Sequence, residues 1–450
     1  MNKQSLISDY LKLYAADKKW QLTRVDQDDF SSAVVIPVYA EKESIFSTLS
    51  SIAHNRASFL RDSLVICVLN NKMSSPAEDK NNNLQTKNII DAIIRKKSLD
   101  KFEAKNNISG HLQKIADSEI KLAYIDACSA GYELPDNTGG VGLARKIGMD
   151  AALRMWQKES LNNKLILSLD ADTLVQDNYL SSIKDYFTKK VKTAIVRYEH
   201  QMPENEEEKA AILSYEIFLR YWVLALRYAQ SPYAYHSIGS TIVTTAQAYL
   251  EVRGMNKKQA GEDFYFLGKL AKIGKINYLQ QTCVYPSARA SRRVPFGTGK
   301  SIQKFLSREF QEYVTYDADV FFILARFIDL VKWNIESPSS DILVKANEID
   351  TLLKIFLENY NYESFWSKLS NRTKDEKVRL KQFHHWFDAF KTLKLINYLT
   401  RQRFPQVNIF NALQKLSNMA QIEKMNIYLS DTIPVLDQQL AILRKLRQIT

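Results

Sequence analysis

The sequence predicts an α/β domain with a mostly parallel sheet and flanking helices, followed by an all-helical C-terminal region. Over the first 285 or so residues, short β-branched runs alternate with helical patterns, which is typical of a sheet with crossover helices. After Gly299 the chain has no glycine, while leucine, lysine and isoleucine recur at helical spacing. We therefore expect an N-terminal helical extension, an α/β domain, a basic loop and a helical domain, over residues 1–30, 31–286, 287–303 and 304–450.

The α/β prediction depends on six short runs and on the helical stripes between them. The stripe of Ala144, Ile147, Ala151 and Met155 predicts one amphipathic helix, and an acidic run at 204–208 predicts the start of a long one. We interpret residues 71–118, which contain the polar run 81–83, as an insertion at the sheet edge. The expected strands are 33–38, 64–69, 120–126, 165–170, 193–199 and 240–244.

Composition limits where the protein works and what it binds. Its 450 residues include three cysteines that lie far apart in apolar runs, which indicates reduced thiols in a reducing compartment. We expect no signal peptide and no membrane span, because the most apolar stretch, 320–333, is interrupted by charges and reads as a core helix. A cytoplasmic protein is expected, with its net charge of +12 mostly after residue 286. This charge suits an anionic partner, which could be a nucleotide diphosphate, an anionic membrane surface or a nucleic acid, and charge alone does not choose among them.

The strongest local motif is Asp170-Ala171-Asp172, at the end of the apolar run that begins at Leu165. Residues i and i+2 of an extended chain point the same way, and α/β sheets bind ligands at the carboxyl ends of their strands. Two carboxylates there suit Mg²⁺ or Mn²⁺ held jointly with a diphosphate. The same pattern also occurs as a simple turn or helix cap.

Three further segments carry candidate chemistry. A glycine cluster at 139–142 opens the helix that contains Arg145, and backbone donors at a helix start attract phosphate. The pair Glu262-Asp263 opens another helix, whose positive end is expected to keep Asp263 ionised as a general base. A loop with the cations Arg289, Arg292, Arg293 and Lys300 could fold over a departing diphosphate. An ordinary turn, an acidic N-cap and a solvated linker are the alternative interpretations of the three.

Taken in order, these pieces resemble the family 2 glycosyltransferases of the GT-A fold, over residues 32–286. The segment 34–41 looks like the first strand and nucleotide-binding turn of that family, 142–148 like its Ala-Arg-Asn helix, Asp170-Ala171-Asp172 like its Asp-x-Asp motif, and Glu262-Asp263 like its Glu-Asp pair. Ala40 stands where the family usually has Asn, and Asn70-Asn71 where it usually has Asp-Asp. The Gln-x-x-Arg-Trp motif of processive synthases is missing.

The resemblance implies an inverting, metal-dependent transfer of a sugar, most simply a hexose, from a nucleotide-diphosphate sugar to an acceptor hydroxyl. It implies Asp172 as the Mn²⁺ or Mg²⁺ ligand with Asp170 as its partner, and Asp263, beside Glu262, as the base. His200, at a strand end, is a candidate third ligand. The donor would lie against Pro37, Val38, Tyr39, Glu41, Asn70, Asn71, Gly142, Arg145, Asp170, Ala171, Asp172, Arg292 and Arg293.

Two other functions remain open. A nucleotidyltransferase would normally have an N-terminal glycine-rich loop ending in Arg and Lys, where this chain has Pro37-Val38-Tyr39. A non-catalytic relative that only binds nucleotide sugars would not need Asp263. The basic helical region could form a dimer, contact an anionic membrane or a lipid-linked acceptor, or brace the catalytic domain; it has no motif for nucleic acid. The sequence leaves open the sugar, the acceptor and the oligomeric state.

Overall fold

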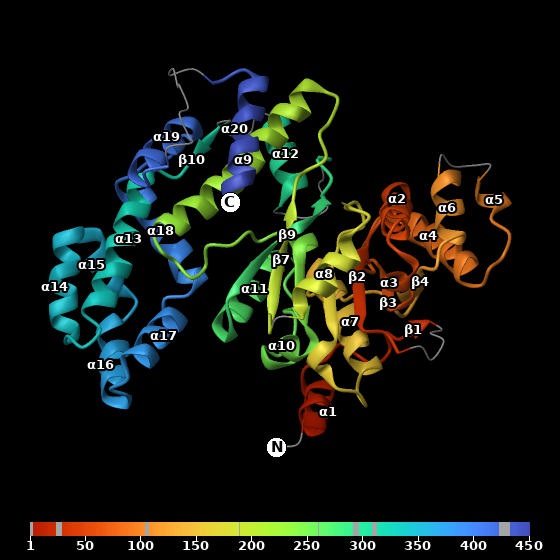
Figure 1. Ribbon diagram of the computed structural model, residues 1–450, viewed down its shortest axis with the longest axis horizontal. Coiled ribbons are helices and arrows are strands. Elements are labelled where there is room, and N and C mark those ends of the chain that lie inside the picture. The colour runs from red at the N-terminus through yellow and green to blue at the C-terminus, as the bar shows by residue number, and fades with distance from the viewer. Residues whose placement is uncertain are drawn as a thin grey trace. The chain divides into compact units, whose positions relative to one another are not determined.

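The computed structural model describes residues 3–23, 29–103, 108–188, 190–259, 261–290, 297–307, 313–422 and 433–450. It comprises two compact units that interleave along the sequence (Figure 1). The α/β unit consists of residues 1–201, 237–288 and 292–297, and the helical unit of residues 202–236, 289–291 and 298–450. Residues 202–236, which the sequence placed in the α/β domain, thus belong to the helical unit, because the apolar side chains of their long helix pack into its core.

The α/β unit contains one nine-stranded sheet in the order β1-β4-β3-β2-β5-β8-β7-β9-β6. The central strands β4, β3, β2 and β5 run parallel, whereas β8 is antiparallel to both of its neighbours. The strands are β1 (Leu22–Thr23), β2 (Ser32–Val38), β3 (Ser63–Asn70), β4 (Lys121–Ala127), β5 (Leu165–Ser168), β6 (Leu174–Val175), β7 (Thr193–Tyr198), β8 (Ile242–Thr245) and β9 (Ile276–Tyr285).

Helices cover both faces of this sheet. Val34, Ile36 and Val38 of β2 point to the face that packs against α2, α4, α6 and α8. Val35 points to the other face, where the absence of a side chain at Gly148 lets α7 approach β2 and β3 closely. The helices of the unit are α1 (Lys3–Leu13), α2 (Lys42–Ala53), α3 (Ala57–Arg61), α4 (Ala77–Ile94), α5 (Asp100–Glu103), α6 (Ser109–Ala116), α7 (Val141–Met155), α8 (Tyr179–Phe187), α10 (Ala246–Glu251) and α11 (Glu262–Ile273).

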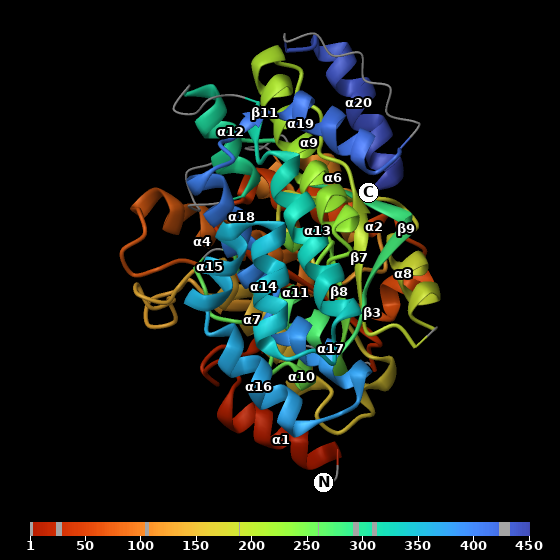
Figure 2. The same cartoon turned by 90° about the vertical axis from the view of Figure 1, so that its left-hand side faces the viewer.

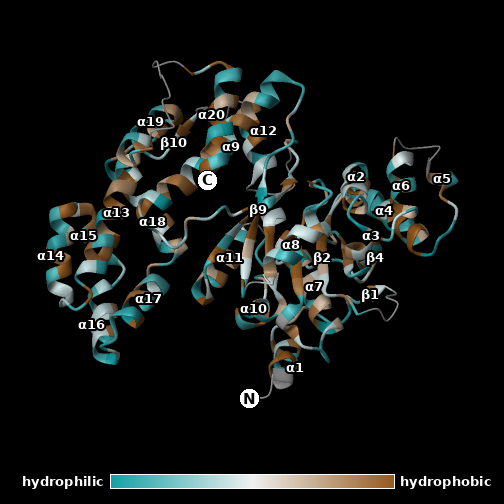
Figure 3. Ribbon diagram, in the orientation of Figure 1, coloured by the Kyte–Doolittle hydropathy of each residue, from teal (hydrophilic) through white to brown (hydrophobic). Residues whose placement is uncertain are grey.

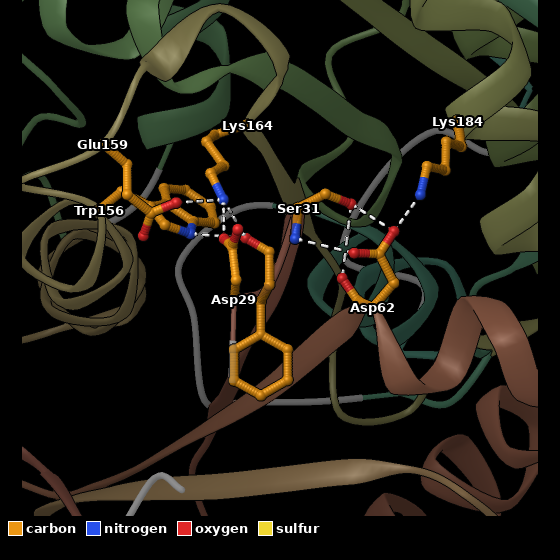
Figure 4. Close-up of polar contacts among 8 residues, drawn as sticks. Asp29, Ser31, Asp62, Trp156, Glu159, Lys164 and Lys184 are labelled. Carbon is orange, nitrogen blue, oxygen red and sulfur yellow. Dashed lines mark hydrogen bonds and ion pairs between the residues drawn. The ribbon is translucent and has the colours of Figure 1, made fainter. Parts of the chain in front are cut away.

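Polar side chains fasten the amino ends of the central strands (Figure 4). Lys164, just before β5, bonds Asp29, Glu159 and the carbonyl oxygen of Phe30, and the Trp156 indole donates to that same carbonyl at 2.9 Å. Ser31, just before β2, donates to Asp62, just before β3, at 2.7 Å. These contacts hold the amino ends of the strands together, whereas the candidate site lies at the opposite, carboxyl ends.

The helical unit is built around one apolar core, and its helices carry hydrophobic and hydrophilic faces (Figure 3). Helices α13, α14 and α15 pack in succession (Figure 2). Its elements are α9 (Glu206–Tyr228), α12 (Thr298–Leu306), α13 (Ala318–Trp333), α14 (Ser339–Ile349), α15 (Thr351–Asn359), α16 (Tyr362–Arg372), α17 (Glu376–Trp386), α18 (Ala389–Gln402), α19 (Ile409–Met419) and α20 (Leu436–Ile449), with a ribbon of β10 (Val314–Thr315) and β11 (Val407–Asn408). No described helix is long and apolar enough to span a bilayer.

The predicted α/β class with an all-helical C-terminal region is confirmed, and each of the six predicted strands corresponds to an observed one. The interpretation of residues 71–118 as an edge insertion is wrong. Their helix α4 packs against β3 and β4, two adjacent parallel strands, and is therefore part of the crossover between them. The polar run at 81–83 does not mark a loop: it lies within α4, and its last residue, Asn83, makes buried hydrogen bonds.

Candidate active site

The Asp170-Ala171-Asp172 motif lies in a turn rather than in a strand. Strand β5 ends at Ser168, and the amide of Thr173 bonds the carbonyl of Asp170 at 3.2 Å to close the turn. The expectation that both carboxylates share one side of an extended chain is therefore wrong. Ala171 is buried, and its carbonyl accepts a hydrogen bond from Thr48 at 2.9 Å, whereas Asp170 and Asp172 remain half-buried. The turn thus presents two oxygen-rich side chains at the carboxyl end of β5.

Arg145 joins this turn to a distant segment. Its guanidinium on α7 contacts Asp170 through one terminal nitrogen and Glu262 through the other. Arg145 is 3% exposed and Glu262 is 4% exposed, while the Asp170 side chain keeps 33% of its surface. Two of the four motifs that carry the family resemblance are thereby bonded to a third.

Gly239 makes room for this guanidinium. A Cβ atom at Gly239 would overlap the terminal nitrogens and the central carbon of Arg145. Gly239 opens the short 3₁₀ turn before β8, which is the antiparallel neighbour of β5. This role of Gly239 does not follow from the sequence, since only the folded chain brings the glycine beside Arg145.

The Glu262-Asp263 pair begins helix α11, as predicted. Gly261, with φ of 67°, supplies the left-handed residue that precedes the helix. The helix terminus does not keep Asp263 fully ionised, however. Burial raises the pKa of Asp263 to about 7, and the negative charge of Glu262 adds to this shift while Arg145 opposes it. Burial also raises the pKa of Glu262, again against Arg145. Desolvation here outweighs the helix dipole.

The glycine cluster at 139–142 serves close packing within the chain. A side chain at Gly142 would meet the carbonyl of Lys258 and the Glu262 side chain, and one at Gly140 would meet Gln259. Asn256, Lys258, Gln259 and Glu262 therefore fill the space that we expected a phosphate to use. Helix α7 begins within this glycine cluster, at Val141, so Arg145 lies in the second turn of the helix.

The predicted nucleotide-binding residues fall into two groups by burial. Pro37 and Val38 lie buried in β2, whereas Tyr39 and Glu41 in the turn after it are half-buried. The side-chain amide of the buried Asn70 donates to the carbonyls of Val38 and Val68, both at 3.0 Å. The side-chain amide of the buried Asn71 donates to the carbonyl of Lys72 at 3.3 Å. Both Asn side chains thus bind the backbone at strand ends. Arg292 and Arg293 lie outside the described residues.

The described residues show no group of three or more His, Cys, Asp or Glu side chains arranged to hold a metal ion, so His200 does not complete a set with Asp170 and Asp172. His200 is buried against the Tyr198 ring. Its neighbour Gln201 donates to the carbonyl of Asp172 at 3.0 Å and so supports the turn. Two half-buried carboxylates still fit a divalent cation, because Mg²⁺ and Mn²⁺ commonly take one or two protein oxygens and complete their shell with phosphate and water.

Comparisons with known proteins give only distant matches. No protein-family model and no curated protein matches this chain. Among solved structures, the chain is similar to residues 1–349 of S. aureus TarS in complex with UDP-GlcNAc, with 12% identity, a TM-score of 0.35, and coverage of 74% of this chain and 92% of that one. It is also similar to the mannosyltransferase PcManGT from Pyrobaculum calidifontis in complex with GDP-Man and Mn²⁺, with 11% identity, a TM-score of 0.31, and coverage of 99% and 92%. Because these values are low, the activity is inferred from the geometry of the site.

Proposed function

We propose that this protein is a GT-A-type, family 2-like glycosyltransferase that transfers a sugar, in the simplest case a hexose, from a nucleotide-diphosphate sugar to an acceptor hydroxyl. The observation that carries the proposal is the contact of one buried guanidinium, Arg145, with both Asp170 and Glu262. These residues come from three separate motifs whose order along the chain resembles that family. Side chains that merely capped their own helices or turns would have no reason to meet.

Asp263 is the proposed base. Its pKa of about 7 lets it accept a proton near neutral pH and still be partly ionised beforehand. In the proposed reaction the acceptor hydroxyl gives its proton to the Asp263 carboxylate, and its oxygen forms a bond to the anomeric carbon. The bond from that carbon to the diphosphate oxygen breaks on the opposite side, and the electron pair leaves with the diphosphate. The configuration at the anomeric carbon is therefore inverted.

Asp172, with Asp170, would hold the divalent cation. Such a cation, when bound, neutralises negative charge that builds up on the leaving diphosphate. Arg145 has a separate role: its single positive charge offsets part of the negative charge of Asp170 and Glu262 and so limits their repulsion of an anionic donor.

Thermal unfolding of the purified protein tests the donor site. UDP, GDP, ADP and CMP are added separately, each with and without Mn²⁺, to the wild type and to Asp172→Ala. Ligand at 100 times its Kd stabilises a protein by about 2.7 kcal/mol, which is a readily measured shift of Tm. We expect a metal-dependent shift with one nucleotide that is lost in the variant. Absence of a shift with every nucleotide would contradict the proposal.

A second measurement separates an enzyme from a non-catalytic relative. Once a nucleotide is identified, its sugar conjugates are incubated with the wild type and with Asp263→Asn, and release of the free nucleotide diphosphate is followed. An enzyme releases the diphosphate in an Asp263-dependent manner. If both proteins bind the conjugate equally and neither releases diphosphate with any acceptor offered, the non-catalytic interpretation is favoured.

A further inference from the structure

Helix α4 presents a row of polar side chains to the carboxyl ends of the central strands. Asp79, Asn83, Lys87 and Asp91 recur every four residues and so share one face of the helix. Lys87 bonds Asp126 at the end of β4 at 2.9 Å, and Tyr124 of β4 donates to Asp91 at 3.5 Å. The two residues nearer the helix start contact the turn that follows β2.

Asn83 is the central member of this row. It is fully buried, and its side-chain oxygen accepts a hydrogen bond from the amide of Ala40 at 2.8 Å. Its side-chain nitrogen donates to the Asn70 carbonyl at 2.8 Å and to the Asn71 side-chain oxygen at 3.2 Å. One amide group therefore links the turn after β2 to the end of β3, which are the two segments expected to line the nucleotide.

The contact with Ala40 matters because the turn is strained there. Ala40 has φ of 54°, in the left-handed region that residues with a side chain rarely adopt. Such a conformation persists only where surrounding contacts hold it. The Ala40 amide is held by Asn83, and no glycine is present to adopt this conformation at lower cost.

Asp79 and Asn82, which lie near Asn83 on α4, also bind the turn that follows β2. The Tyr39 hydroxyl donates to Asp79 at 2.6 Å, and the amide of Lys42 donates to Asn82 at 3.1 Å. Consecutive segments of the turn are thus fixed by one helix, while Tyr39, Glu41 and Lys42 keep part of their surface accessible to a ligand.

We infer that Asn83 is a positioning residue for the donor nucleotide: through Ala40 it holds Tyr39 and Glu41 where the base and ribose bind. This inference rests on the proposed function, because it assumes that the turn after β2 contacts a nucleotide. The positioning role thus belongs to helix α4, in the segment that the sequence pattern predicted to be an insertion at the sheet edge.

Calorimetric titration of the full chain tests the inference. Wild type is first titrated with UDP, GDP, ADP and CMP in the presence of Mn²⁺, and the nucleotide that binds is then titrated into Asn83→Ala. We expect about tenfold weaker binding, since the variant loses a buried hydrogen-bond partner that shapes the site. The double variant Asn83→Ala/Ala40→Gly should recover affinity to within about threefold of wild type, because glycine adopts positive φ without strain.

Asn55 offers a matched control. It is also a buried asparagine, with its nitrogen bonded to the carbonyls of Ile52 and Gln176 and its oxygen bonded to the amide of Leu180, but it lies beyond the far end of α2. Asn55→Ala should lower the Tm of the free protein as much as Asn83→Ala does, yet leave nucleotide affinity within about twofold of wild type.

The outcomes separate the two proposals. If wild type binds none of the nucleotides, the proposed function fails. If wild type binds one and Asn83→Ala binds it equally well, the positioning role is wrong and the proposed function stands. If Asn83→Ala does not fold, it is replaced by Asp79→Ala, which removes one hydrogen-bond acceptor of the Tyr39 hydroxyl at a partly exposed position. About threefold weaker binding at unchanged Tm then supports the inference, and unchanged affinity overturns it.

Discussion

Helix α7 takes part in two buried ionic clusters that differ in how completely their charges are matched. In the first, Asp150 is fully buried and has four donors: the hydroxyls of Tyr10 at 2.6 Å and Tyr249 at 2.8 Å, the amide of Ala16 at 2.7 Å and the Lys146 ammonium at 3.0 Å. Every neighbour donates to the one carboxylate. Through these hydrogen bonds, the N-terminal segment (Tyr10 and Ala16) and α10 (Tyr249) are bound to α7.

In the second cluster, carboxyl groups outnumber the positively charged groups. One guanidinium, that of Arg145, faces the carboxylates of Asp170 and Glu262, and Asp263 adds a third carboxyl group nearby, which is only partly ionised near neutral pH. Asp170 also keeps a third of its side-chain surface accessible. Negative charge is therefore in excess, and part of it can be reached from outside.

The difference indicates what each cluster is for. A sealed carboxylate with a full set of donors contributes to stability and has no capacity left for a ligand. A cluster with surplus carboxylates and partial exposure can accept a cation or a proton, and this capacity is what a site for a metal-bound diphosphate and a general base requires. The following four predictions test this contrast, beginning with the largest expected effect.

Asp263→Asn should lower the rate of sugar transfer by about 10²–10⁴-fold, because the amide cannot accept the hydroxyl proton. The fold should be preserved, since the substitution removes a half-buried carboxyl whose charged form is disfavoured. Steady-state transfer assays and the Tm of the same preparations check both statements. A variant that retains full activity would exclude Asp263 as the base.

Asp150→Ala should destabilise the protein by about 3–5 kcal/mol, because it leaves the Lys146 ammonium and two hydroxyls buried without their acceptor. Urea unfolding measures this loss. Tyr249→Phe, which removes one of the four donors, serves as the milder comparison at about 1 kcal/mol. If Asp150→Ala lost nucleotide affinity but kept its stability, the purely structural role of the Asp150 cluster would be wrong.

The pH dependence follows from the raised pKa of Asp263, about 7. Transfer should fall about tenfold for each pH unit below this midpoint, because only the carboxylate accepts a proton. The folded state binds this proton more tightly than the unfolded chain, whose carboxyl has its ordinary pKa near 3.8. The free energy of unfolding contributed by Asp263 therefore decreases as pH rises from about 4 to about 7. Asp263→Asn should remove this decrease in pH-dependent unfolding experiments, and an unaltered profile would contradict the shift.

Gly239→Ala should weaken donor binding or transfer by about three- to tenfold, because the new methyl group can be accommodated only if the Arg145 guanidinium moves away from a carboxylate. Gly110→Ala is the matched control: Gly110 lies in α6 with open space around its Cα, and alanine is the better helix former. Equal activity of both variants would show that the Arg145 bridge tolerates displacement.

Much of the fold could be predicted because it is encoded locally. The apolar runs 33–38 and 64–69, within β2 and β3, indicate buried parallel strands, and the start of α11 at Glu262 followed from its acidic first turn. Strand β9 was missed because its buried and exposed residues do not alternate, and its pairing with β7 is interrupted by a register shift between Val196 and Arg197. The role of α4 was missed because its polar residues look solvated until the strand ends lie beside them.

By itself, the sequence determined which chemical groups are present and on which elements they lie: the carboxylates at 170, 172 and 263, the arginine at 145 and the helices or turns that hold them. Only the tertiary structure decided which of these groups meet. Arg145 and Glu262 are 117 residues apart, and Asn83 lies 43 residues from the Ala40 amide that it binds. The physical reason is that a side chain's charge state and bonding depend on burial and on neighbours distant in sequence. Asp263 therefore has a raised pKa despite its place at a helix start.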